Sequence, residues 1–173
     1  MELARLIRTV PDFPVKGILF RDITTLIRDG EALQEAIDTM VEHYIDTDID
    51  VIAGVEARGW IFGAPLAYEL GAGFVPIRKP SKLPAEKINI SYSLEYGSNT
   101  LEMHKDAIAP GTKVLIVDDL LATGGSAKAA ISLIEQLGGQ VVSLAFLIEL
   151  TDLHGRDKLK GYDVYSMIQF EGE

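Results

Sequence analysis

Uninterrupted runs of apolar residues are the strongest pattern along the chain. The clearest lies in residues 113–119, where four aliphatic residues stand in a row before two aspartates. A run with no polar position to face water is typical of a parallel strand that is buried on both faces of its sheet. Other apolar runs predict strands at residues 51–54, 73–78, 141–150 and 163–170.

Between these runs, apolar positions repeat every three or four residues, as on the buried face of a helix. One such pattern starts at Asp29-Gly30 and places residues 33, 36, 37, 40, 41 and 44 on one face. Helices are also predicted at residues 59–70 and 124–137, each followed by glycine, which commonly ends a helix. The pattern further predicts a short helix within residues 2–10 and an irregular or extended segment at residues 18–25.

Strands that alternate with helices predict an α/β domain, with a mainly parallel sheet flanked by helices. The length of 173 residues fits one domain, so residues 1–173 are expected to fold together. Residues 88–104 differ, because apolar and polar residues alternate singly there and a turn interrupts them at residues 96–99. This pattern predicts a hairpin, which we expect to project from the main sheet as a flexible loop.

Net charge narrows the classes of ligand. The formal net charge of −10 disfavours binding to nucleic acid, which usually requires a basic surface. Within this acidic chain, however, Arg78, Lys79, Lys82 and Lys87 fall close together. Such a cluster indicates a small anionic ligand, although a solvated loop would give the same local composition.

Other features of the sequence indicate the cellular compartment in which the protein works. The chain contains no cysteine, and we find neither a signal peptide nor an apolar run of about 18 residues or more. We therefore expect a cytoplasmic protein with no membrane segment and no thiolate chemistry.

The richest chemistry follows the clearest strand. Asp118 and Asp119 end the apolar run, and a short loop leads into the helix predicted at residues 124–137. Glycines and the free N–H groups of a helix N-terminus suit a phosphate, whereas paired carboxylates suit vicinal sugar hydroxyls. The segment therefore predicts a site for ribose 5-phosphate, with an ordinary strand–loop–helix turn as the alternative. The candidate residues are Asp118, Asp119, Ala122, Thr123, Gly124, Gly125 and Ser126.

This segment resembles the phosphoribosyl-pyrophosphate signature of the type I phosphoribosyltransferases, and the resemblance extends over nearly the whole chain. It does not match a Walker loop, which requires Gly-Lys-Ser/Thr after its first glycine. The resemblance implies the type I phosphoribosyltransferase fold, with phosphoribosyl pyrophosphate as the donor substrate. It also implies Mg²⁺, bound mainly through that donor, and a homodimer.

A second loop, at residues 54–60, follows a predicted strand and opens a helix. Its backbone N–H groups and Arg58 could bind another anion, although Glu56 and Arg58 could also form a surface ion pair. In the family the corresponding loop holds pyrophosphate, and the resemblance indicates a cis non-proline peptide there. We therefore expect the pyrophosphate site to contain Glu56, Ala57, Arg58, Arg78, Lys79 and Lys82.

Residues 17–24 resemble the base-binding segment of the adenine-specific members of the family. There, the backbone around Leu19 and Arg21 would contact the purine edge, while the Phe20 ring would stack on the base. The alternative is that Leu19 and Phe20 belong to the hydrophobic core.

Two further features favour adenine. Residues 92–97 resemble a mobile loop of the family that closes over the ribose, so we expect Tyr96 to assist closure. Ala122 stands where the members specific for hypoxanthine and guanine have an acidic residue, so a proton-exchanging group must lie elsewhere. Glu95 is the candidate catalytic residue, although it could be an ordinary surface carboxylate.

Together these features predict transfer of a 5-phosphoribosyl group from phosphoribosyl pyrophosphate to adenine, which gives AMP and pyrophosphate. One alternative is transfer to another purine such as xanthine, because enzymes for that base can also lack the acid at Ala122. Another is a regulator that binds the same donor and controls transcription without catalysis. The acidic net charge disfavours the regulator.

Overall fold

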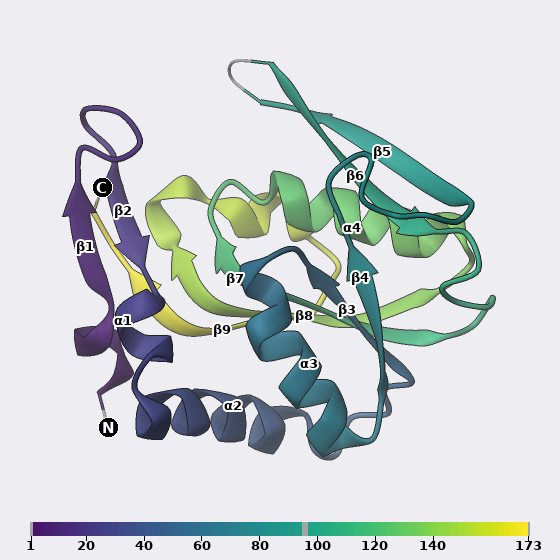
Figure 1. The fold of residues 1–173 in the computed structure, drawn as a ribbon, viewed down its shortest axis with the longest axis horizontal. Coiled ribbons are helices and arrows are strands. Elements are labelled where there is room, and N and C mark those ends of the chain that lie inside the picture. Colours follow the sequence, from purple (N-terminus) through teal and green to yellow (C-terminus); the bar gives the residue numbers. More distant parts are fainter. Residues whose placement is uncertain (1, 95–96, 173) are drawn as a thin grey trace.

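The computed structural model describes residues 2–94 and 97–172. Its centre is a five-stranded parallel sheet in the order β4-β3-β7-β8-β9 (Figure 1). This arrangement confirms the predicted α/β class, and all five strands predicted for the sheet are present. Their bounds are β3 Val51–Val55, β4 Gly73–Ile77, β7 Lys113–Leu121, β8 Gln140–Leu150 and β9 Val164–Phe170.

Helices cover both faces of this sheet, as predicted (Figure 1). The short helix α1 (Thr24–Ile27) leads into α2 (Gly30–Tyr44), whose first turn is capped by the Asp29 side chain. Helices α2 and α3 (Arg58–Leu70) pack on one face, and α4 (Gly125–Gln136) packs on the other.

The strand β7 shows why an uninterrupted apolar run was needed. Leu115 and Val117 belong to the hydrophobic cluster that also contains residues of α2 and α3. Val114 and Ile116 point the other way, into the cluster that contains residues of α4. All four side chains are fully buried, so neither face of this strand can accept a polar residue.

The N-terminal segment corrects one prediction. In place of a helix through residues 2–10, the structure has a 3₁₀ helix, Leu3–Leu6, followed by strand β1 (Arg8–Pro11). Strand β1 pairs in antiparallel fashion with β2 (Leu19–Asp22), which lies in the segment predicted to be irregular or extended. The helical spacing of apolar residues extends over only a few residues. Strand pairing with β2 determines the structure of residues 8–11 instead.

The predicted hairpin is confirmed by strands β5 (Lys87–Ser93) and β6 (Ser98–His104), which pair over their whole length. Figure 1 shows the hairpin lying above α4 and extending beyond the main sheet. Backbone hydrogen bonds between Arg78 and Glu102 join the hairpin to the end of β4. The hairpin is therefore attached to the same segment that contains the predicted pyrophosphate-binding cations.

Candidate active site

The carboxyl end of β7 opens into a cleft of about 500 Å³, lined by Arg58 and residues 118–127. The lining includes all seven residues that the sequence predicted for ribose 5-phosphate. Ligand sites of open parallel sheets occur at this end of the strands. The cleft also brings Arg58 beside Asp118 and Asp119, although about 60 positions separate them along the chain.

The loop at residues 122–126 owes its shape to Gly124. This residue has φ of +83°, and its backbone leads directly into the first turn of α4. A Cβ placed on Gly124 would stand 2.5 Å from the carbonyl oxygen of Gly155 and would also be strained at that φ. The loop therefore packs against a second backbone segment and lines the cleft at the N-terminus of α4, where the first N–H groups of a helix have no partner within the helix.

Gly155 is a site residue that the sequence analysis missed. It starts a 3₁₀ helix, Gly155–Leu159, in the connection between β8 and β9, and it lies against Ala122 and Gly124. The contact joins positions about 30 residues apart, and no local motif marks Gly155.

The two aspartates have different surroundings. Asp119 is buried and accepts a hydrogen bond from Nε of Arg58, with 2.6 Å between Nε and Oδ2. Asp118 accepts a hydrogen bond from the Asp119 backbone N–H. Burial, and then the adjacent charge of Asp119, raise the pKa of Asp118 well above its ordinary value. The pair offers carboxyl oxygens that can accept hydrogen bonds from a diol, and Arg58 neutralises part of its charge.

The loop before α3 has the features expected of the pyrophosphate segment. The Glu56–Ala57 peptide is cis, as the resemblance indicated. Oε1 of Glu56 accepts hydrogen bonds from the Lys79 backbone N–H at 2.7 Å and from Nε of Arg78 at 3.1 Å. Although burial opposes the charged form, these two donors lower the pKa of Glu56. Glu56 thus ties the loop at the end of β3 to the segment that follows β4.

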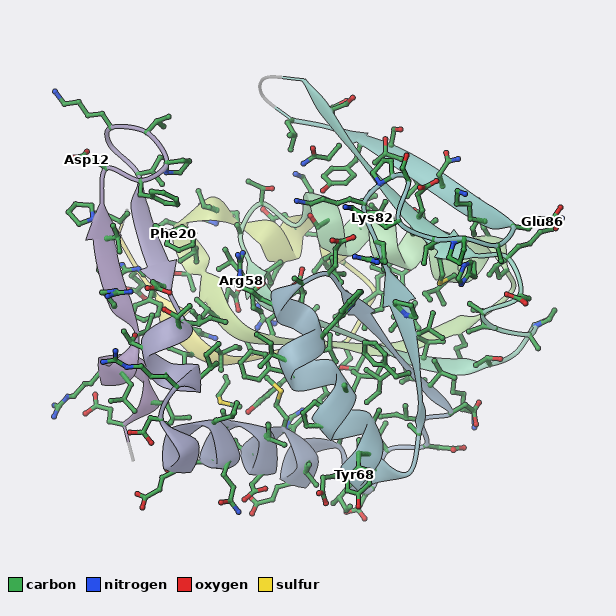
Figure 2. The ribbon with its side chains drawn as sticks, in the orientation of Figure 1. Asp12, Phe20, Arg58, Tyr68, Lys82 and Glu86 are labelled. Carbon is green, nitrogen blue, oxygen red and sulfur yellow. The ribbon has the colours of Figure 1, made fainter. Side chains whose placement is uncertain are left out.

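The predicted cations divide into two groups. The Arg78 guanidinium pairs with Glu56 and lies 5.0 Å from the centre of the Trp60 ring, so its side chain holds the local structure together. Lys79 and Lys82 are exposed. Figure 2 shows Lys82 on the hairpin side of Arg58 and Phe20 on the opposite side.

The predicted base-binding residues lie on β2, beside the cleft and outside its lining. Leu19, Phe20 and Arg21 are half-buried, so they are not simply core residues. The Phe20 ring meets the Phe13 ring edge-on, with 5.1 Å between the ring centres. The Arg21 guanidinium donates to Thr9 and lies over the Phe170 ring, which leaves the Arg21 side chain with a structural role.

Glu95 and Tyr96 lie outside the described residues, so their predicted roles stay predictions. The strand that leads to them does reach the cleft. The Tyr92 hydroxyl lies 2.8 Å from the Ser126 hydroxyl, and the Tyr92 ring covers Gly125. The hairpin therefore contacts the phosphate loop three residues before Glu95.

Within residues 2–94 and 97–172, no group of three or more His, Cys, Asp or Glu side chains is arranged to hold a metal ion. No described helix is long and apolar enough to cross a membrane.

Known proteins are similar to this chain in both sequence and fold. Residues 24–172 match the family model for the phosphoribosyl transferase domain. An adenine phosphoribosyltransferase of Halothermothrix orenii is 62% identical over 169 residues, which cover 98% of this chain and 99% of that protein. The structure of adenine phosphoribosyltransferase from Thermoanaerobacter pseudethanolicus is 54% identical, with a TM-score of 0.95 and 98% of each chain covered. That of Saccharomyces cerevisiae, complexed with an imino-altritol bisphosphate and adenine, is 44% identical, with a TM-score of 0.90 and 96% of each chain covered. The chain belongs to the phosphoribosyltransferase family, among the adenine phosphoribosyltransferases.

Proposed function

We propose that this protein transfers the 5-phosphoribosyl group of phosphoribosyl pyrophosphate to adenine, giving AMP and pyrophosphate in purine salvage. The observation that supports this most strongly is the cleft at the end of β7, where a phosphate loop and two carboxylates lie side by side. The similarity to adenine phosphoribosyltransferases over nearly the whole chain supports adenine as the acceptor.

Donor binding uses the two halves of the cleft. The 5-phosphate accepts hydrogen bonds from backbone N–H groups of Gly124 and Gly125 and from the hydroxyls of Thr123 and Ser126. The ribose hydroxyls donate to Asp118 and Asp119. With the phosphate and the diol both fixed, the anomeric carbon is held in one position for attack by the base.

The leaving group needs positive charge. As the bond at ribose C1 breaks, negative charge develops on pyrophosphate, and Arg58, Lys79 and Lys82 stabilise it. The N–H groups around Glu56 and Ala57 complete this site. Arg78 acts indirectly, because its pairing with Glu56 positions the loop.

Mg²⁺ fits the chemistry of this donor set. Asp118 and Asp119 present carboxylate oxygens beside the position of the diol, and magnesium prefers oxygen ligands that include substrate phosphates. We propose that Asp118 and Asp119 would help to hold an ion that is bound mainly through the donor. When bound, it would neutralise part of the charge on pyrophosphate.

The acceptor lies on the side of β2. The backbone at Leu19 and Arg21 contacts the purine edge and Phe20 stacks on the ring. Glu95 takes the proton that the imidazole ring of adenine loses on attack, because Ala122 in the phosphate loop cannot exchange one. Tyr96 assists closure of the hairpin, which excludes water from the reacting sugar.

The deciding experiment measures pyrophosphate release with phosphoribosyl pyrophosphate and Mg²⁺, offering adenine, hypoxanthine, guanine and xanthine in turn. We expect release with adenine to exceed release with each other base by at least about a hundredfold, since unmatched hydrogen-bonding groups are strongly rejected. A preference for xanthine would show that xanthine, and not adenine, is the acceptor. Donor binding without release with any base would indicate a non-catalytic regulator.

We also propose that the protein acts as a homodimer in the cytoplasm, as the family resemblance implies. Sedimentation at micromolar concentration should give twice the 18.9 kDa mass of the chain. A monomeric mass with full activity would contradict the dimer without affecting the reaction.

A further inference from the structure

The contact between Tyr92 and Ser126 joins two parts of the site that the chain keeps apart. Tyr92 lies on β5, and Ser126 lies in the first turn of α4, 34 positions later. Their hydroxyl oxygens are 2.8 Å apart, a normal hydrogen-bond distance. Neither hydroxyl is needed to fill space, because the Tyr92 ring already packs over Gly125.

The direction of this hydrogen bond depends on what Ser126 binds. A serine hydroxyl has one proton to donate and two lone pairs that accept. When Ser126 donates its proton to the 5-phosphate, it can only accept from Tyr92. Tyr92 then donates to Ser126, and Ser126 donates to the phosphate. Successive hydrogen bonds in such a chain polarise and strengthen one another, most of all when the final acceptor is charged.

We propose that Tyr92 is a positioning residue, whose hydroxyl orients Ser126 toward the 5-phosphate and couples phosphate binding to the hairpin that contains Glu95. The proposal rests on the phosphate role of Ser126 given above. A bound phosphate strengthens the Tyr92–Ser126 hydrogen bond, so the bond holds β5 against α4 more tightly. Occupation of the phosphate loop therefore restricts strand β5 at Tyr92, three positions before Glu95 in the sequence.

The coupling also has a second anchor. Glu102 on β6 exchanges backbone hydrogen bonds with Arg78, and its carboxylate accepts from the Ser81 backbone N–H at 2.9 Å. The hairpin is therefore fixed near its base through Glu102 and held near its turn through Tyr92. The contact near the base does not depend on the phosphate, whereas the contact near the turn does.

The main test is Tyr92→Phe, which keeps the ring and removes only the hydroxyl. We expect calorimetry to show about fivefold to tenfold weaker binding of ribose 5-phosphate, and of phosphoribosyl pyrophosphate with Mg²⁺. Binding of inorganic pyrophosphate should stay within twofold of the wild type, because it does not use the phosphate loop. The control is Ser91→Ala, which breaks a hydroxyl pair with Thr100 in the same hairpin, away from Ser126. It should leave all three affinities unchanged.

A double-mutant cycle separates this inference from the proposed function. If Ser126→Ala does not weaken ribose 5-phosphate binding, the phosphate assignment itself is wrong. If Ser126→Ala weakens it, Tyr92→Phe should add less than twofold in that background, since its effect passes through Ser126. Equal effects of Tyr92→Phe in both backgrounds would overturn the inference and leave the proposed function standing.

Hydrogen exchange gives a direct measure of the coupling. Ribose 5-phosphate should slow amide exchange in residues 91–94 of the wild type, and this protection should disappear in Tyr92→Phe. Protection that persists in the variant would show that the hairpin responds to phosphate without this hydroxyl.

Discussion

The two ends of the candidate site are built from different kinds of structure. The donor end follows β7, a central strand whose aliphatic side chains are fully buried, and its loop packs against the backbone at Gly155. The acceptor end lies on β1 and β2, a two-stranded sheet outside the main sheet. Phe13, which packs on Phe20, is 50% exposed. Part of the site is therefore fixed by the core, while the rest is held by a few local contacts.

This difference matches the two tasks of the site. The donor end serves a step that is the same for every acceptor, whereas the acceptor end selects one base. The donor is common to the whole family. The proposed donor site is formed by β7 and α4, and a change in either element would disturb the core. The acceptor side can change without moving β7 or α4, because β2 pairs with no strand other than β1 within the part of the chain that the structure describes. Substitutions at the two ends should therefore affect different substrates, and by different mechanisms.

The largest effect is expected for Gly124→Val at the donor end. The new side chain would be strained at φ of +83° and would meet the Gly155 carbonyl, so the loop could not keep its shape. Calorimetry should detect no binding of phosphoribosyl pyrophosphate, while circular dichroism should show a largely intact fold. The control is Gly111→Val, at the same φ of +83° but in open space. It should bind the donor normally, and unchanged donor affinity in Gly124→Val would refute the phosphate loop.

The next largest effect is expected for Glu95→Gln, at the candidate catalytic residue. The variant keeps size and hydrogen bonding but cannot exchange a proton, so kcat for adenine should fall by about 10²–10⁴-fold with small changes in KM. Single-turnover measurements would check this. Glu86→Gln, at the opposite end of the hairpin, should be neutral.

Two other outcomes for Glu95 are informative. If Glu95→Gln is mild but Glu95→Leu is severe, Glu95 supports closure and does not exchange a proton. If Glu95→Gln equals the wild type in a single turnover, proton transfer by Glu95 is rejected, and the donor site is unaffected by that result.

Phe20→Ala tests the acceptor end alone. Loss of stacking on the base should raise KM for adenine by about tenfold to a hundredfold, in line with about 1–3 kcal/mol for stacking of a base on an aromatic ring. Donor affinity should stay within twofold. Val15→Ala, an exposed position in the same N-terminal region, serves as the control. A lower melting temperature with unchanged KM for adenine would mean that Phe20 is only a packing residue.

The smallest effect on catalysis is expected at Asp22, which ends β2. Hydrogen bonds from Thr24, together with Arg8, lower the pKa of Asp22 to about 2. An unfolded aspartate has a pKa of about 3.9, so the charged form stabilises the fold above about pH 4, and this contribution is lost as pH falls toward 2. Asp22→Asn should therefore lower the free energy of unfolding by about 2 kcal/mol at pH 7.

The pH dependence distinguishes this cause from a packing defect. In urea unfolding, the difference between Asp22→Asn and the wild type should shrink as pH falls from 4 to 2. A difference that stays constant over that range would contradict the assignment. Adenine turnover at pH 7 should remain within about twofold of the wild type.

The same division explains what could be predicted from the sequence. Strand β7 and its loop were predictable because a run of four buried aliphatics, two aspartates and two glycines has few other interpretations. The segment at residues 2–10 was predicted to be helical, since nine residues with apolar spacing fit a helix or a strand almost equally well. Its pairing with β2 decides the outcome, and that partner is not visible locally.

Contacts between distant segments account for the rest. Nothing near Gly155 in the sequence shows that its backbone lies against Gly124. Arg78 was grouped with the pyrophosphate-binding cations by its position in a basic cluster, and its ion pair with Glu56, 22 positions away, was not visible in the sequence. The role of the Tyr92 hydroxyl also depends on a partner 34 positions away.

The ion pair between Arg58 and Asp119 has a consequence for molecules that resemble only part of the donor. Each side chain is assigned to a different portion of the ligand, and in the structure each neutralises the other. With the proposed assignments, a diol alone would engage Asp119 and leave Arg58 without a ligand group. Pyrophosphate alone would draw Arg58 away and leave a buried carboxylate uncompensated, which is unfavourable. We therefore expect the pair to favour a molecule that carries both groups over free sugars and free pyrophosphate.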